Sequence, residues 1–274
     1  MKILKKSLKY FFLFSLFLSV GLWLYTKTLV PVYEGEIEIK NLSEEVKIHF
    51  DAIGVPHINA QNQQDAYTAL GYLHAQDRLW QMELIRRIAA GRLSEIFGEK
   101  LIDADIFMSG LGIEENAQET IQNLDKSSEM YQLSMAYLDG INQYIANGKT
   151  PIEFTIVGVE KEMYTLKDMY NVFGYMAFSF AVAHKTDPLL SEVKEVLGEN
   201  YLNELIDAES QNLTFIKSEK NPEIKAAFGV AMQKLFEALP ISPFIGSNSW
   251  VLGSEKTKNG KVIFANDPHI GYSQ

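Results

Sequence analysis

The sequence predicts an α+β fold, with a mostly helical region followed by a β-hairpin near the C-terminal end. Two observations carry this prediction. Apolar residues recur at helical spacing over three long stretches, residues 65–88, 127–146 and 169–184. Residues 46–51 and 250–265 instead contain alternating or β-prone runs, and Asn259-Gly260 in the second region is typical of hairpin turns.

The composition describes an ordinary globular protein. Hydrophobic residues make up 47% of the 274 residues and charged residues 22%, which is enough apolar surface to bury a core in one large domain or two modest ones. The formal net charge of −10 argues against nucleic acid as a partner, because binding to phosphates requires a basic face. The absence of cysteine excludes disulfides and thiolate metal sites.

The N-terminus has the pattern of a secretory signal or a signal anchor. Lysines crowd the first nine residues and precede an uncharged apolar run from Tyr10 to Tyr25, which Lys27 closes. The run is short for a membrane span, which needs about 17–25 residues. Ser19-Val20-Gly21 is a candidate cleavage site, but apolar residues continue beyond it, so we favour an uncleaved anchor. The positive-inside rule then places the rest of the chain on the periplasmic or extracytoplasmic side.

A short strand region and a long helix come next. Residues 46–51 alternate as a strand, Gly54-Val55-Pro56 turns the chain, and residues 57–60 resume extended structure. The helix over residues 65–88 has an apolar stripe of Ala66, Leu70, Leu73, Leu79, Met82 and Ile85. Its charged residues, Asp77, Arg78 and Glu83 among them, are expected to form local ion pairs on a solvated side.

Two further helices follow. The first, residues 127–146, is expected to bury a stripe of Met130, Leu133, Tyr137, Ile141 and Tyr144. The second, residues 169–184, follows a sequence that resembles a capping box and is apolar around most of its circumference, so it should be buried on several sides. Met176 and Phe180 lie four residues apart and share one face. That face is either plain core or the wall of an apolar pocket.

Ser247 is the main candidate for chemistry. Residues 217–222 form a polar linker, residues 223–239 an amphipathic helix, and the prolines of residues 240–246 forbid regular structure up to Gly246-Ser247. If the chain cuts itself there, Ser247 acquires an α-amino group that titrates near pH 7.7–8.0. This amine can accept the proton of the serine hydroxyl, a nucleophile-and-base pairing known for N-terminal threonine.

The hairpin is expected to bring His269 towards this serine. Pro268 cannot donate to a ladder, so we expect it to close the second strand and turn His269 outward. Ser247 and His269 then lie at corresponding ends of neighbouring strands. The alternative is a surface hairpin with a solvated histidine. An ordinary hydrolase with an internal serine is disfavoured because the G-x-S-x-G pattern is absent.

Three blocks of sequence together resemble the penicillin acylases, which are N-terminal-nucleophile hydrolases. The blocks are Gly54-Val55-Pro56-His57-Ile58, then Ala75-Gln76-Asp77-Arg78-Leu79 through Met82-Glu83 and Arg87, then Ser247-Asn248-Ser249-Trp250 through Asn266-Asp267-Pro268-His269. The resemblance covers residues 46–274 and implies an αββα sandwich when the protein is complete. It further implies a precursor, or zymogen, that cleaves itself before the serine into an α/β heterodimer.

The resemblance also implies roles for individual residues. Ser247 would be the nucleophile and Gly246-Ser247 the autoproteolytic bond, and His269 would lie beside the nucleophile. The substrate pocket would include Met176, Phe180 and Ile270. Asp187 is the candidate for a structural calcium site, and no cofactor is implied for the chemistry. The penicillin G members carry an arginine just before the pocket phenylalanine, whereas this chain has Ser179, so penicillin G preference is less secure.

The expected organisation has four parts. Residues 1–30 are a signal anchor or signal peptide, 31–216 an α-subunit-like helical region, 217–246 a spacer and 247–274 the start of a β subunit. The resemblance places the oxyanion-hole residues beyond Gln274, so we expect this fragment to be inactive alone.

The expected function is hydrolysis of a linear amide C–N bond in a small N-acyl substrate. Penicillin-like, cephalosporin-like and acyl-homoserine-lactone substrates are all compatible with the resemblance. The alternative function is a non-catalytic, membrane-tethered helical binding module.

Overall fold

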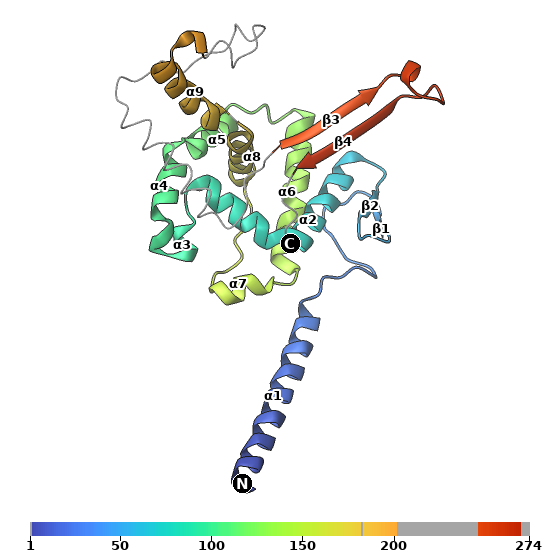
Figure 1. Ribbon diagram of the computed structural model, residues 1–274. Helices are drawn as coiled ribbons and strands as arrows, with labels where there is room; N and C mark the ends of the chain where they lie inside the picture. The colour runs from blue at the N-terminus through green and yellow to red at the C-terminus, as the bar shows by residue number, and fades with distance from the viewer. Residues whose placement is uncertain (1, 182, 202–245, 270–274) are drawn as a thin grey trace. The chain divides into compact units, whose positions relative to one another are not determined.

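The computed structural model describes residues 2–181, 183–201 and 246–269 (Figure 1). These residues form nine α-helices, two short 3-10 helices and two two-stranded antiparallel sheets. The predicted fold class, mostly helical with a hairpin near the C-terminal end, is confirmed. Contacts divide the chain into two compact units: one joins residues up to Met82 with Asn123–Leu166, and the other joins Glu83–Gln122 with the described residues from Lys167 onward.

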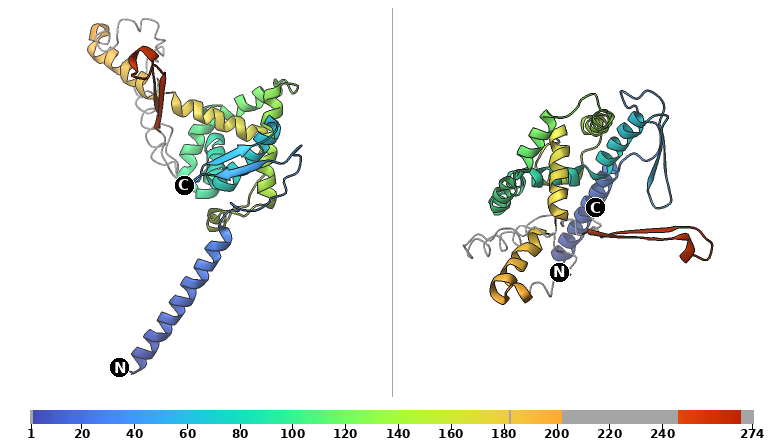
Figure 2. Two further views of the ribbon diagram at one scale, coloured as in Figure 1. Left: turned by 90° about the vertical axis from the view of Figure 1, so that its right-hand side faces the viewer. Right: turned by 90° about the horizontal axis from the view of Figure 1, so that it is seen from above.

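The first unit begins with helix α1, Lys2–Leu29, which is one uninterrupted helix (Figure 2). Its part Lys6–Leu29 is long and apolar enough to cross a membrane, with a mean hydropathy of 1.6. The helix extends past the predicted apolar run because Thr26 and Thr28 bond their hydroxyls to carbonyls three residues earlier and so remain compatible with helix. A cleaved signal sequence shares all of these features.

Strands β1, Lys47–Phe50, and β2, Pro56–Asn59, form the first sheet, with His49 opposite His57. Asp51 fixes the turn between them, because its carboxylate accepts hydrogen bonds from the backbone N–H groups of Ile53 at 3.0 Å and Val55 at 2.9 Å. Gly54 adopts φ +81°, a left-handed conformation that glycine tolerates without strain. The predicted strand–turn–strand is confirmed.

Helices α2, Gln63–Ala90, and α6, Glu129–Asn147, build the core of the first unit. They cross very closely at two glycines: a Cβ on Gly140 would lie 1.9 Å from the carbonyl oxygen of Thr68, and one on Gly71 would lie 2.0 Å from that of Tyr137. Helix α7, Ile152–Val157, closes this core through an edge-to-face contact between Phe154 and Trp80. The bounds predicted for α2 and α6 are confirmed to within a few residues.

Two details of these helices differ from the predictions. Met130 was expected in the buried stripe of α6 but is 73% exposed, because it lies in the first turn of the helix, just after the capping residue Ser128. Helix α2 is not regular throughout, since Arg78 has non-helical angles of φ −135° and ψ 18° and the helix kinks there.

The second unit contains the end of α2 and a set of shorter helices. They are α3, Ser94–Phe97; the 3-10 helix Glu99–Leu101; α4, Ile102–Gly110; α5, Ile113–Gln122; α8, Leu166–Phe180; and α9, Ala183–Leu197. Asp105 ties α4 to the start of α3, because its carboxylate accepts the backbone N–H groups of Leu93 at 2.8 Å and Ser94 at 2.7 Å. The predicted helix 169–184 is wrong at its end: α8 stops at Phe180, where neither glycine nor proline signals a break in the sequence.

The second sheet consists of β3, Gly246–Leu252, and β4, Ile263–His269. Asn259-Gly260 belongs to the connection between these strands, which also includes the 3-10 helix Ser254–Lys256. Gly260 has φ +65°, and the Asn259 side chain accepts a hydrogen bond from the backbone of Lys261 at 3.1 Å. This bond turns the chain without a positive φ at Asn259.

Candidate functional site

The hairpin β3–β4 places Gly246-Ser247 at one end of an antiparallel ladder (Figure 1). Gly246 pairs with His269 and Ser247 with Pro268, so Ser247 and His269 are one register step apart at corresponding ends of the two strands. This part of the prediction is confirmed. The closeness of their side chains stays a prediction, because the side chain of His269 lies outside the described residues.

Pro268 does not close the strand, contrary to the prediction. Strand β4 continues through Pro268 to His269. Each strand of a two-stranded sheet has an outer edge, and a proline whose missing N–H faces that edge costs no ladder hydrogen bond. Ser247 itself is exposed on this hairpin.

Helix α8 carries the two predicted pocket residues, Met176 and Phe180. Its buried residues are Asn171, Tyr175 and Ser179, which are spaced by four and therefore share one face of the helix. Met176 is half-buried and Phe180 is 40% exposed. The helix is therefore not buried on all sides, and Met176 and Phe180 do not belong to the fully buried core. Their place in the wall of a substrate pocket stays a prediction.

Several contacts fix the position of α8 within its unit. Lys167 forms an ion pair with Glu114 of α5, and Gly174 packs so closely on Ile113 that a Cβ would lie 2.6 Å from the Ile113 Cγ2 atom. The ring centroids of Phe178 and Phe107 are 6.2 Å apart. Helix α8 is therefore attached to α4 and α5 at three levels along its length.

The first turn of α8 also meets a buried network of charges that the sequence did not reveal. Glu83 is only 2% exposed and pairs with both Arg86 and Arg87, the latter at 2.5 Å between Oε1 and Nε. Arg86 Nη1 lies 3.7 Å from Asp168 Oδ2, and Arg87 Nη1 lies 2.5 Å from Glu95 Oε2. Local ion pairing of Glu83 was predicted correctly, but its expected solvation was wrong, because two arginines neutralise it inside the core.

Two further groups of the second unit have pKa values shifted from their ordinary range. The pKa of the Glu95 carboxyl is lowered, chiefly by the hydrogen bond from Arg92, with Arg87 adding to the effect. Burial raises the pKa of the Tyr175 hydroxyl to about 12, so this group stays protonated at physiological pH. The hydroxyl has no hydrogen-bond partner within the described part of the chain.

The remaining predicted site residues are not placed. Ile270 and the linker residues 217–245 lie outside the described residues, as does the side chain of Asp187, although its backbone belongs to α9. Within the described ranges, no three His, Asp or Glu side chains form a group able to hold a metal ion. The calcium expectation therefore stays a prediction.

Comparison with known proteins identifies the family. The chain belongs to the penicillin amidase family, whose model, described as "Penicillin amidase", matches residues 45–274. It is 33% identical over 250 residues to the penicillin acylase 2 proenzyme of Pseudomonas sp. (strain SE83), covering 88% of this chain and 32% of that protein. It is 30% identical over 261 residues to the acyl-homoserine lactone acylase QuiP of Pseudomonas aeruginosa, covering 91% of this chain and 30% of that protein.

The chain thus spans about a third of the length of the curated relatives it matches. Among solved structures, it is similar to a thermostable penicillin G acylase from Alcaligenes faecalis, with a TM-score of 0.47 and 23% identity. That alignment covers 65% of this chain and 96% of the other.

Proposed function

We propose that the complete protein hydrolyses the amide bond of small N-acyl substrates. Membership of the penicillin amidase family supports this proposal, as do the names of the relatives, a penicillin acylase and an acyl-homoserine lactone acylase. The single observation that carries it is the placement of Gly246-Ser247 at the start of β3, paired with the end of β4. The complete protein would adopt an αββα sandwich.

In this proposal Ser247 acts after the bond between Gly246 and Ser247 has been cleaved. The hydroxyl oxygen attacks the substrate carbonyl, and the new α-amino group takes the hydroxyl proton through a water molecule. The proton is then transferred to the amide nitrogen as the C–N bond breaks. The amine departs, and the acyl group remains as an ester on Ser247. Water then hydrolyses the ester and releases the acid. Because an α-amine titrates near pH 8, about half of it is neutral just above physiological pH and able to act as the base.

The acyl group would be largely apolar. Met176 and Phe180 lie on a partly exposed face of α8, where a hydrophobic acyl chain can cover them. Ile270 would complete this wall, His269 would lie beside the nucleophile, and Asp187 would contribute to a structural calcium site. Penicillin-like, cephalosporin-like and acyl-homoserine-lactone substrates all offer such an acyl group, and a panel of N-acyl amides would distinguish them.

The proposed location is the periplasmic or extracytoplasmic side of a membrane, with α1 as anchor. The apolar helix Lys6–Leu29 and the lysines before it support this orientation. Cleavage before Ser247 would then yield an α/β heterodimer whose smaller subunit keeps the anchor.

The test is the intact mass of the product of the complete reading frame. We expect a species that begins at Ser247, and none in Ser247→Ala. Ser249→Ala is the matched control, because Ser249 lies two positions along the same strand and on the same face of the ladder. Normal cleavage and hydrolysis are expected for that control. Hydrolysis by an uncleaved protein, or by Ser247→Ala, would contradict the proposal.

A chemical test separates the base from the nucleophile. Selective acylation of the α-amino group in the matured protein should abolish hydrolysis, although the serine hydroxyl is still present. Undiminished hydrolysis after complete blocking would exclude the amine as the base.

A further inference from the structure

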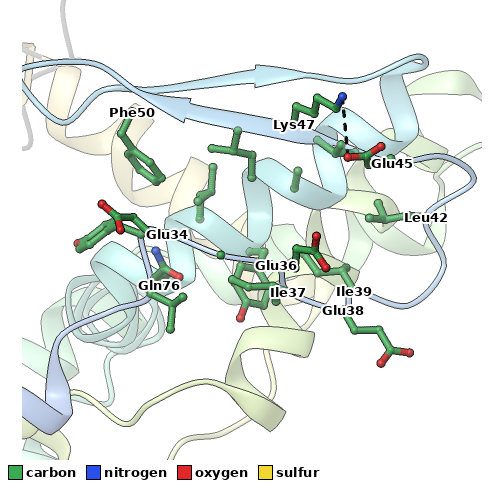
Figure 3. A pocket seen from close by; sticks show the side chains of 18 residues that line it. Glu34, Glu36, Ile37, Glu38, Ile39, Leu42, Glu45, Lys47, Phe50 and Gln76 are labelled. Carbon is green, nitrogen blue, oxygen red and sulfur yellow. Dashed lines mark ion pairs between the residues drawn. The ribbon is translucent and has the colours of Figure 1, made fainter.

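A groove with a volume of about 760 Å³ lies in the first unit, between strand β1, helix α2 and the segment that precedes β1 (Figure 3). All of its lining residues fall between Val32 and Gln76. None of the predicted site residues is among those that line it, and the family comparison assigns no role to it. Its walls combine an apolar interior with an acidic rim.

One side of the groove is the segment of residues 34–39, which we call the acidic strap. Its sequence alternates glutamates at 34, 36 and 38 with Gly35, Ile37 and Ile39. The chain bends at Glu34 and Gly35, where Gly35 has φ +108°, and from Glu36 to Ile39 the period of two gives an extended chain one acidic and one apolar side. Both ends are held: the Tyr33 hydroxyl donates to Asp77 Oδ1 at 3.2 Å, and the Lys40 N–H donates to Gln143 Oε1 at 2.7 Å. Between these points the strap backbone makes no hydrogen bond to any residue that the structure describes.

The other side of the groove is the free edge of β1. Strand β1 pairs only with β2 among the described strands, so its second edge is unpaired. Ile48 and Phe50 of β1 line the groove and are half-buried. The groove thus lies between the edge of β1 and the strap, which approach each other at one end, where Tyr33 packs edge to face on Phe50 with ring centroids 5.2 Å apart. The facing backbone donors and acceptors of β1 and of residues 36–39 are not used within the described chain.

The floor of the groove holds an unsatisfied donor. Gln76 of α2 is 5% exposed, and its Nε2 has no hydrogen-bond partner among the described residues. Figure 3 shows this amide turned toward the space below Phe50. A buried donor without a partner costs about 1–3 kcal/mol, so an acceptor placed here would be bound favourably. Ala69 and Leu73 beside it are apolar.

We propose that the groove binds an extended peptide segment in which apolar and basic residues alternate. The segment is added as a strand between β1 and the acidic strap, and its backbone pairs with both edges. Its apolar side chains turn toward Leu73 and Ile48, its basic side chains turn toward the glutamates of the strap, and one of its carbonyls accepts a hydrogen bond from Gln76 Nε2.

Charge selects this occupant over other ligands. Lys47, the basic side chain of the lining, lies 4.0 Å from Glu45, and none of the described residues forms an ion pair with the three glutamates of the strap. Anionic segments are repelled by this rim. A purely apolar ligand would leave the two backbone edges and the Gln76 amide unpaired, and unpaired polar groups oppose burial.

The test uses the full chain in nanodiscs of zwitterionic lipid and fluorescent eight-residue peptides, read by polarisation. We expect binding of a peptide that alternates valine with lysine. Weaker binding is expected of a peptide with the same composition in two blocks, and none of a valine–glutamate alternation. Gln76→Leu should weaken binding about tenfold, the loss of one buried hydrogen bond. If Gln76→Leu fails to fold, the charge variant described next still tests the proposal, because it is expected to gain binding of a different peptide.

The charge variant replaces Glu34, Glu36 and Glu38 by lysine. It should now bind the valine–glutamate peptide and lose the valine–lysine peptide. Glu160→Lys, at an exposed position of the same unit, is the control and should change neither. Unchanged preference in the triple variant would overturn the proposal.

Hydrogen exchange separates strand addition from simple charge attraction. Peptide binding should protect the amides of residues 34–39 and of β1. A peptide with N-methylated backbone should not bind, since it lacks the donors that a strand needs. Equal binding of the N-methylated or the block peptide would overturn the proposal, as would the absence of binding at millimolar concentration. Dimerisation of the chain that the triple variant abolishes would show a second copy in the groove and would also overturn it.

Discussion

In the first unit, helices α2 and α6 meet through two glycines, whereas in the second unit the end of α2 meets α8 through buried charges. A methyl group on Gly140 would lie 1.9 Å from a backbone oxygen, so this crossing requires a residue without a side chain at position 140. Glu83, by contrast, is buried because two arginines neutralise it, so its position depends on the presence of partners.

The difference teaches that one helix can be held by two unlike kinds of packing. A close crossing is sensitive to volume, because protein interiors have no free space for an added methyl. A buried ion pair is sensitive to the loss of one member, because the other is then left charged in a dry environment. The kink at Arg78 lies within the first unit, which ends at Met82, so substitutions before Arg78 and from Glu83 onward should act on different units.

The largest effect is expected for Glu83→Leu, which removes the acceptor shared by Arg86 and Arg87. Breaking a buried pair by removing one partner costs about 3–5 kcal/mol. The loss should appear in the free energy of unfolding from urea titrations. Hydrogen exchange should assign it to α4, α5 and α8 rather than to α6. Glu99→Leu, at an exposed position of the same unit, is the control. Loss of amide protection confined to α6 would show that Glu83 stabilises the first unit rather than the second.

Gly140→Ala should destabilise the first unit instead. The new methyl group cannot fit against the Thr68 carbonyl, and overpacking of this kind costs about 1–3 kcal/mol. Amides of α6 and of the first half of α2 should exchange faster, while those of α8 remain unchanged. Gly110→Ala is the matched control, because a Cβ there meets no atom within 4 Å. Equal stability of the two variants would show that the crossing is looser than its geometry indicates.

Asp105→Asn is expected to have a smaller effect, again in the second unit. The amide keeps one acceptor oxygen for Leu93 or Ser94, but its NH₂ group faces the other backbone N–H. One buried donor is left unsatisfied, which costs about 1–3 kcal/mol, so the lower part of that range is expected. Asp103→Asn changes an exposed carboxylate on the same helix and should be neutral in the same urea titrations. A neutral Asp105→Asn would mean that the two hydrogen bonds do not stabilise the start of α3.

Sequence periodicity predicted the long helices well, because each is a continuous amphipathic stretch with its own capping signals. It predicted α2 as residues 65–88, against Gln63–Ala90 in the structure. It could not show that Glu83 is buried, since the acids that complete the network, Asp168 beside Arg86 and Glu95 beside Arg87, come from other segments of the chain. A signal did exist: Glu83, Arg86 and Arg87 have the i, i+3, i+4 spacing of a neutralised cluster within an otherwise apolar helix.

For the hairpin β3–β4, the sequence predicted which strand ends pair but not the full course of the second strand. The pairing of the Gly246-Ser247 end with His269 was predictable from two β-prone runs joined by a polar connection. The course of β4 through Pro268 was not, because the tolerance of a strand for proline depends on which of its edges is paired. The connection between the strands is stabilised by the side chains of Thr257 and Asn259, which bond the backbone at Lys261.

The smallest effect concerns pH and the first unit alone. Burial lowers the pKa of His74, with Asp77 partly opposing the shift, and His74 Nδ1 lies 2.9 Å from the Tyr137 hydroxyl. The unfolded chain therefore takes up a proton near pH 6.5 while the folded chain does not. The free energy of unfolding should fall as pH decreases below about 6.5, until the folded histidine is protonated too. The slope should stay well below the roughly 1.4 kcal/mol per pH unit of one full proton, because His74 keeps a solvent-exposed surface that screens the shift. His74→Gln should reduce this slope, and His57→Gln, whose ring is exposed, should retain it. A slope that survives in His74→Gln would place the pH dependence outside the α2–α6 contact, and the first unit would then depend on packing volume alone.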